Sequence, residues 1–85
     1  MVPAITGLVV IYRDGKTYGG ATAADVVRRI AEDGILTVGQ SNVEYMAGVK
    51  ERLFNLDKIR ISYRDEAEFL EELERHGSIE IRRMS

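Results

Sequence analysis

The chain has 85 residues, with 14 acidic against 12 basic side chains and a formal net charge of −2 at pH 7. This length predicts a single compact domain over residues 1–85. The near-neutral charge disfavours nucleic acid as a general partner, and no stretch approaches the ~20 apolar residues of a membrane helix. Cysteine is absent, which excludes disulfides and thiolate metal sites and is consistent with a cytoplasmic location.

The first third of the sequence predicts a β-hairpin followed by a helix. Residues 8–12 are apolar and β-branched, as in a strand that is covered on both faces. Asp14-Gly15 is a strong hairpin signal, so residues 16–18 should return antiparallel. Thr22 has the character of an N-cap, and Gly34 is a natural terminator for the helix that follows.

A capping box over residues 41–44 predicts a second helix from about residue 42 to residue 55. Gly48 interrupts this helix, either to allow a close approach by a neighbouring element or because the structure tolerates it. Residues 35–39 are expected to form an extended connector or a brief strand. The buried stripe of the helix is expected to contain Tyr45, Met46, Val49, Leu53 and Leu56.

The last third predicts strand, helix, strand. Residues 58–63 and 78–82 alternate apolar and polar side chains, and between them lies a glutamate-rich helix that Asp65 begins and Gly77 ends. A strand–helix–strand crossover favours a parallel pair. We therefore expect an α+β (α/β-type) domain of order β-β-α-α-β-α-β, with three helices and a mixed four-stranded sheet.

Strand alternation also predicts two unequal sheet faces. Ile59, Ile61 and Tyr63 should share the core face with Ile79 and Ile81, because alternate residues of a strand lie on the same side.

In the first strand we assign Val9 and Ile11 to the core. This leaves an apolar strip of Leu8, Val10 and Tyr12 on the other face, which needs cover. A helix of the same chain is the favoured cover, and a second copy in a homodimer or a different protein partner are the alternatives.

Two charged surfaces are candidates for docking. Glu68, Glu71 and Glu72 form part of an acidic ridge, read mainly as a solvated helix face and secondarily as a docking surface for a basic partner. Basic residues gather around Lys50, Lys58 and the strand that follows. Parallel pairing would place Arg60 and Arg64 near Arg82, with Tyr12 as a stacking ring, in an alternative reading as a nucleic-acid surface.

No catalytic set is evident in the sequence. His76 is the only histidine and is expected to interact with the carbonyl end of a helix, so no triad or zinc site can be completed. The Gly19-Gly20 turn before a helix N-terminus is a further candidate, for a small anion or ligand, but its glycine spacing fits no phosphate-binding motif. We expect no enzyme, no cofactor and no metal, and a protein-interaction or assembly module as the leading function.

Overall fold

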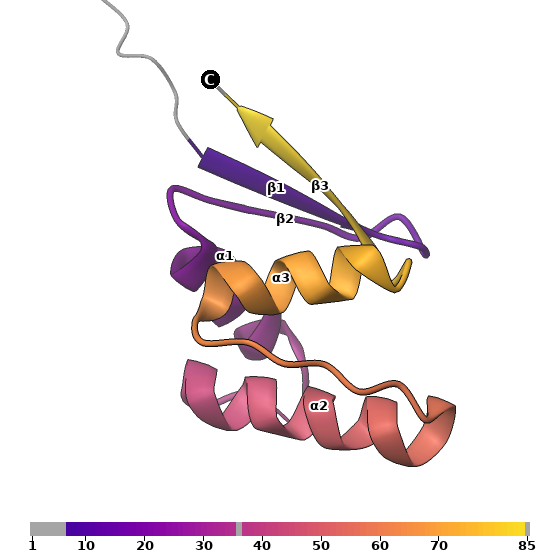
Figure 1. Cartoon of the computed structure of the whole chain (residues 1–85). Helices are drawn as coiled ribbons and strands as arrows, with labels where there is room; N and C mark the ends of the chain where they lie inside the picture. Colours follow the sequence, from indigo (N-terminus) through magenta and orange to yellow (C-terminus); the bar gives the residue numbers. More distant parts are fainter. Residues whose placement is uncertain (1–6, 36, 85) are drawn as a thin grey trace, which may run out of the picture.

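The computed structural model describes residues 7–35 and 37–84. Its elements are, in order, β1 (Gly7–Tyr12), β2 (Thr17–Gly20), α1 (Ala23–Asp33), α2 (Asn42–Asp57), α3 (Glu66–Arg75) and β3 (Ile79–Met84). The helices lie on one side of a three-stranded antiparallel sheet of order β2-β1-β3 (Figure 1). The predicted α+β class is confirmed.

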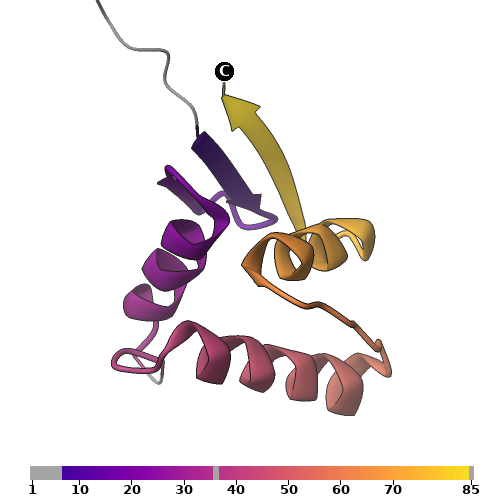
Figure 2. The same cartoon turned by 60° about the vertical axis from the view of Figure 1, so that its left-hand side comes forward.

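The layers run from the sheet through α1 and α3 to α2. Helices α1 and α3 contact the strands, whereas α2 contacts only these two helices. Figure 2 shows α2 crossing beneath α1 and α3, on the side away from the sheet. One face of α2 is therefore turned away from the rest of the fold.

The predicted hairpin is confirmed. β1 pairs antiparallel with β2, with Val9 opposite Gly19. In the turn, the N–H of Gly15 donates to the carbonyl of Tyr12 at 2.9 Å, and the Asp14 carboxylate accepts from the N–H of Lys16 at 3.0 Å. Gly15 has φ +93°, a conformation that costs glycine little and other residues more.

The parallel pair expected in the last third is wrong, and the sheet has one strand fewer than predicted. β3 pairs antiparallel with β1, so β1 is the central strand, and residues 58–63, which were predicted to form a strand, lie outside the sheet. Both edges of β1 are occupied by β2 and β3. Alternating apolar and polar side chains indicate an extended chain that is buried on one side. In residues 59–63 this side packs against helices, so the pattern is satisfied without strand pairing.

The faces of β1 are the reverse of those predicted. Val10 is fully buried and lies opposite Ile81, while Leu8 and Tyr12 also pack against the core. Directly paired residues of antiparallel strands share a face, so Val9 and Ile11 lie on the opposite side. Helices of the same chain cover the Leu8, Val10 and Tyr12 strip, but as part of the single core face and not as a separate cover on the opposite face.

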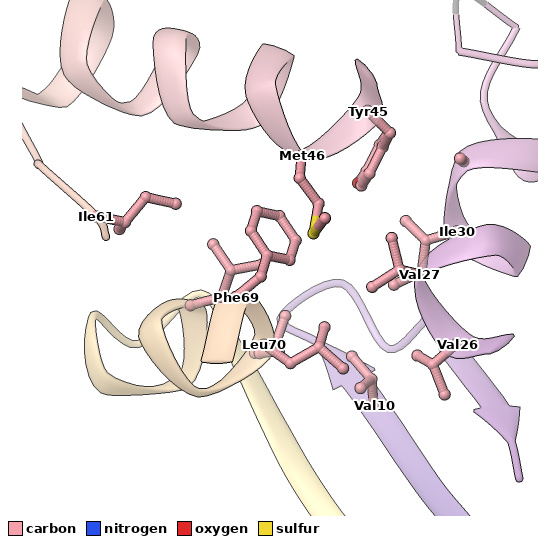
Figure 3. Packing of buried hydrophobic residues seen from close by; sticks show 12 residues of the cluster. Val10, Val26, Val27, Ile30, Tyr45, Met46, Ile61, Phe69 and Leu70 are labelled. Carbon is pink, nitrogen blue, oxygen red and sulfur yellow. The ribbon is translucent and has the colours of Figure 1, made fainter. Parts of the chain in front are cut away.

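Buried side chains from every helix meet β1 and β3 in one core cluster (Figure 3). Phe69 of α3 lies at its centre and is completely buried. Its ring makes edge-on contacts with Tyr63, at 5.2 Å between centroids, and with Tyr45 of α2, at 6.3 Å. Tyr63 thereby ties the extended residues 58–64 to the core.

The helix ends follow the sequence signals closely. The hydroxyl of Thr22 accepts from the N–H of Asp25, Ser41 forms the predicted capping box, and the Asp65 carboxylate accepts from the N–H of Glu68. Gly34 is the C-cap of α1 but is extended rather than left-handed, and turns follow it toward α2. Leu36 of the predicted connector lies outside the described residues.

Helix α2 ends at Lys58, which adopts a left-handed conformation with φ 57°. Its N–H donates to the carbonyl of Phe54 at 3.1 Å, and the chain then runs back between α2 and α3 (Figure 1). Leu56, predicted to be buried, is 78% exposed because the end of α2 extends past the core. Tyr45 and Met46 are buried as predicted, and Val49 and Leu53 are partly so.

Candidate functional site

An open groove of about 640 Å³ lies between α2 and the extended residues 58–64; we call it the α2 groove. Two other hollows on the described surface are smaller, at about 360 and 350 Å³. Seven residues line it: Ala47, Lys50, Glu51, Phe54, Arg60, Ile61 and Ser62.

Local sequence explains how the two walls form. Ala47, Lys50 and Phe54 are spaced three and four apart, so they lie on one face of α2. On the other wall, Ile61 is 3% exposed and points into the core, as Figure 3 shows. Its neighbours Arg60 and Ser62 are exposed, as alternation in an extended chain requires.

Three cations border the groove, and each lies over an aromatic ring. The guanidinium carbon of Arg60 is 4.8 Å from the ring centroid of Phe54, and the ammonium of Lys58 is 5.5 Å from the same centroid. The ammonium of Lys50 is 5.8 Å from the ring centroid of Tyr63. Contacts of this kind attract a cation to the ring face without neutralising its charge.

None of these three cations forms an ion pair within the part of the chain that the structure describes. Glu51 is the one acid among the groove-lining residues. The α2 groove thus combines an aromatic and aliphatic floor with a net positive border, although the whole chain is slightly acidic.

Residues 60–63 form the outer wall of the α2 groove, and their backbone lacks hydrogen-bond partners among the described residues. The N–H of Ile59 donates to the carbonyl of Leu53 at 3.1 Å, and the N–H of Arg64 donates to the Glu68 carboxylate at 2.8 Å. Between these points, residues 60–63 make no backbone hydrogen bond to any other described residue. Each of them still carries a donor and an acceptor, and water has to satisfy these groups in the unbound chain.

Most of the predicted acidic ridge is engaged by the chain itself. Glu68 accepts three hydrogen bonds from the Arg64 guanidinium, at 2.7, 3.0 and 3.2 Å. These bonds, with that from the Arg64 N–H, hold the pKa of Glu68 below its usual value. Glu72 accepts from Arg75 at 3.1 Å. Of the three acids named for docking, Glu71 alone makes no hydrogen bond or ion pair with a described residue.

The structure does not bring the predicted arginines together. Arg82 lies on β3, opposite Val9, and pairs with Glu80 at 2.9 Å on the sheet face away from the helices. Arg60 instead lies over Phe54 of α2, and Arg64 pairs with Glu68 of α3. The reason is the antiparallel β1–β3 pairing, which removes the strand neighbour expected for Arg82.

The apolar strip packs against the core: Val10 is buried, and Leu8 and Tyr12 are partly buried. Val10 has no exposure, and Tyr12 packs edge-on against Tyr18 at 5.7 Å between ring centroids. Burial of the Tyr12 hydroxyl raises its pKa. Val10 therefore cannot contact a partner in this fold, and the packed Tyr12 ring is not open for stacking on a base.

Gly19 and Gly20, predicted as a turn, are the last two residues of β2, and the N-cap of α1 follows two residues later. The N–H of Asp25 donates to the Thr22 hydroxyl at 3.2 Å, and the N–H of Val26 donates to the Thr22 carbonyl at 3.1 Å. A Cβ added at Gly20 would lie 2.8 Å from the Asp25 Cβ, so strand and helix meet there without space for a ligand. Two of the amides in the first turn of α1, those of Asp25 and Val26, are therefore already bonded within the chain.

Sequence reasoning found Lys50, Lys58 and Arg60 as basic residues but missed Phe54. The sequence did contain a signal for Phe54. It lies outside the apolar stripe of α2, which indicates an exposed ring, and it follows Lys50 by four residues, which places it beside a cation on the same helix face. Within residues 7–35 and 37–84, no group of three potential metal ligands occurs. No helix in these ranges is long and apolar enough to cross a membrane.

Comparison with protein families, with curated proteins and with solved structures finds no match for this chain.

Proposed function

We propose that the chain is a small cytoplasmic, non-enzymatic protein-interaction module that holds a protein partner in the α2 groove. One observation carries the proposal: an open apolar groove is bordered by cations that form no ion pair with any described residue. Aromatic and arginine side chains in a concave site are the groups that contribute most to protein–protein binding.

The groove cations also differ from the arginines that are paired elsewhere on the surface. Arg64, Arg75 and Arg82 are each paired with a glutamate of the same chain, which leaves them little to offer a partner. Arg60 instead lies over Phe54, which is 39% exposed. Covering this ring would remove apolar surface from water, worth about 25 cal/mol per Å² before the costs of association.

The test compares variants of the full chain in quantitative affinity enrichment. Phe54→Ser removes the ring from the groove, and Val43→Ser is the matched control because Val43 is a 73% exposed apolar residue of α2 that does not line the groove. We expect specific proteins to be retained by the wild type and by Val43→Ser but not by Phe54→Ser. An identical set of proteins on all three baits would contradict the proposal.

A nucleic-acid role for Arg60 and Arg64 gives a different result. It predicts retention of the wild type on an oligonucleotide column at low salt, with loss of retention as salt rises. We expect the wild type to pass through such a column, because Glu68 neutralises Arg64 and Arg82 is remote. Retention that Arg60→Ser abolishes would overturn the protein-interaction proposal.

A further inference from the structure

We propose that the partner supplies an extended, acidic segment that adds as a β-strand to residues 60–63 along the α2 groove. This inference rests on the proposed function and names the class of ligand and the mode of recognition. Strand addition takes its affinity from main-chain hydrogen bonds and its specificity from alternate side chains.

The first support is the unused backbone of the outer wall. Residues 59–63 alternate between covered and exposed side chains, as an extended chain does, but no strand lies beside them among the described residues. Ile61 is buried, and the partly buried Tyr63 packs against the same core, so the segment is held in place for an incoming strand. A fixed, unpaired extended segment is a template for pairing with another chain.

The second support is a contrast between residues 60–63 and β3, one of the two edge strands of the sheet. On β3, the Glu74 carboxylate accepts from the backbone N–H of Ile81 at 2.8 Å. This bond occupies a donor that a strand added to β3 would need. No side chain of the described residues blocks residues 60–63 in this way, so the groove wall is the more receptive of the two.

The third support is charge. A residue that pairs with Ile61 lies on the buried side with it, and its neighbours along the incoming strand point outward, beside Arg60 and Ser62. Lys50, Lys58 and Arg60 border this path and have no ion pair in the described residues. An incoming strand that alternates acidic and apolar side chains matches both sides of the wall.

Charge also argues against a second copy of this chain as the occupant. Antiparallel self-pairing that keeps the apolar residues on one face allows three registers about the centre of the segment. One register places Arg60 opposite Arg60, and none gives Arg60 an acidic neighbour, because residues 58–64 contain no acid. Like charges directly opposite each other destabilise a strand pair, so the partner strand has to come from a chain of different composition.

The binding test uses the full chain and fluorescein-labelled octapeptides, read by fluorescence anisotropy at low salt. The probe alternates glutamate and valine, and the matched peptide carries lysine in place of glutamate. We expect the acidic peptide to bind at least about tenfold more tightly than the basic one, a difference of about 1.4 kcal/mol. Arg60→Glu should remove this preference, whereas Arg82→Glu, at an exposed arginine outside the groove, should retain it.

Strand pairing is tested by N-methylating the peptide at its valines or, separately, at its glutamates. Each set of amides lies on one edge of a strand, so one of the two methylated peptides should lose about tenfold in affinity and the other should not. Equal binding of both methylated peptides and the parent would overturn strand addition.

The remaining outcomes separate the two proposals. If neither peptide binds while Phe54→Ser still abolishes retention of a protein, the strand inference fails and the proposed function stands. Preferential binding of the basic peptide, or a dimer of the wild type in light scattering that Arg60→Glu disrupts, would also overturn the inference. Binding of oligothymidylate in place of the acidic peptide would overturn both proposals.

Discussion

Replacing Ile61 with alanine tests how the outer wall of the α2 groove is held. Because residues 60–63 make no backbone hydrogen bonds to the described chain, side chains alone fix them to the core. Ile61 is 3% exposed, which makes it the most deeply buried of the three apolar residues on this segment.

The expected cost follows from the lost packing. Removing a buried isoleucine side chain to alanine costs about 2–5 kcal/mol, depending on how far the site can collapse. The α2 groove lies directly beside Ile61 and lets the segment and water adjust, so we expect the lower part of this range, about 2–3 kcal/mol. This is a large share of the roughly 4–13 kcal/mol typical of a domain with this number of residues.

The assay is urea unfolding followed by far-ultraviolet circular dichroism, because the chain contains no tryptophan. With a denaturant slope of about 1 kcal/mol per molar urea, the midpoint should fall by about 2–3 M. Ser62→Ala is the matched control, since Ser62 is exposed on the same segment, and it should change stability by less than about 0.5 kcal/mol. A loss below about 1 kcal/mol for Ile61→Ala would refute the claim that this side chain anchors the wall.

Three further outcomes test the fold in solution. Val10→Ala should cost about 2 kcal/mol in urea unfolding and Val9→Ala distinctly less, because Val10 is fully buried and Val9 is not; equal losses would contradict the assigned faces of β1. Gly48→Ala should raise stability by about 0.5–1 kcal/mol in the same assay, since a Cβ there meets nothing within 4 Å, and a decrease would mean that a close contact was missed. The hydrogen bond from the Tyr18 hydroxyl to Asp33, 2.6 Å long, raises the pKa of Tyr18 to about 12. Its stabilisation is therefore complete below about pH 10, the ordinary tyrosine pKa, and is lost as pH rises toward about 12; Asp33→Asn should lower this pKa in an absorbance titration, and no change would exclude the bond.

The local structure was largely predictable from the sequence because its signals are local. Thr22, Ser41 and Asp65 begin helices through side-chain bonds to amides three residues away, and Asp14-Gly15 encodes the hairpin in adjacent residues. Each choice is decided within one turn of the chain, so neighbouring residues are sufficient evidence.

The strand pairing was not predictable because it depends on which elements compete for β1. Alternation in residues 58–63 correctly gave an extended chain with Ile61 inside, but it cannot distinguish a strand in a sheet from a segment packed on helices. The face of β1 was ambiguous for a similar reason. Residues 8–12 are apolar throughout, so the choice of Val10 over Val9 came from pairing with β3.

The candidate site was predictable only in part. Arg60 was identified from composition, but its companions were taken to be Arg64 and Arg82 through a pairing that does not form. The return of the chain along α2 brings Arg60 to Phe54 instead. That return depends on a left-handed residue at position 58, for which a lysine gives no sequence signal, because glycine is the residue usually found there.

The left-handed Lys58 also sets stability against recognition at a single residue. A non-glycine side chain in this conformation costs roughly 1 kcal/mol, so Lys58→Gly should make the free protein harder to unfold. The same change would remove an ammonium group that lies 5.5 Å from the Phe54 ring at the border of the groove. Selection for thermal resistance alone would therefore replace this lysine and weaken capture of an acidic ligand, so a stabilised variant should be assayed for binding before it is used.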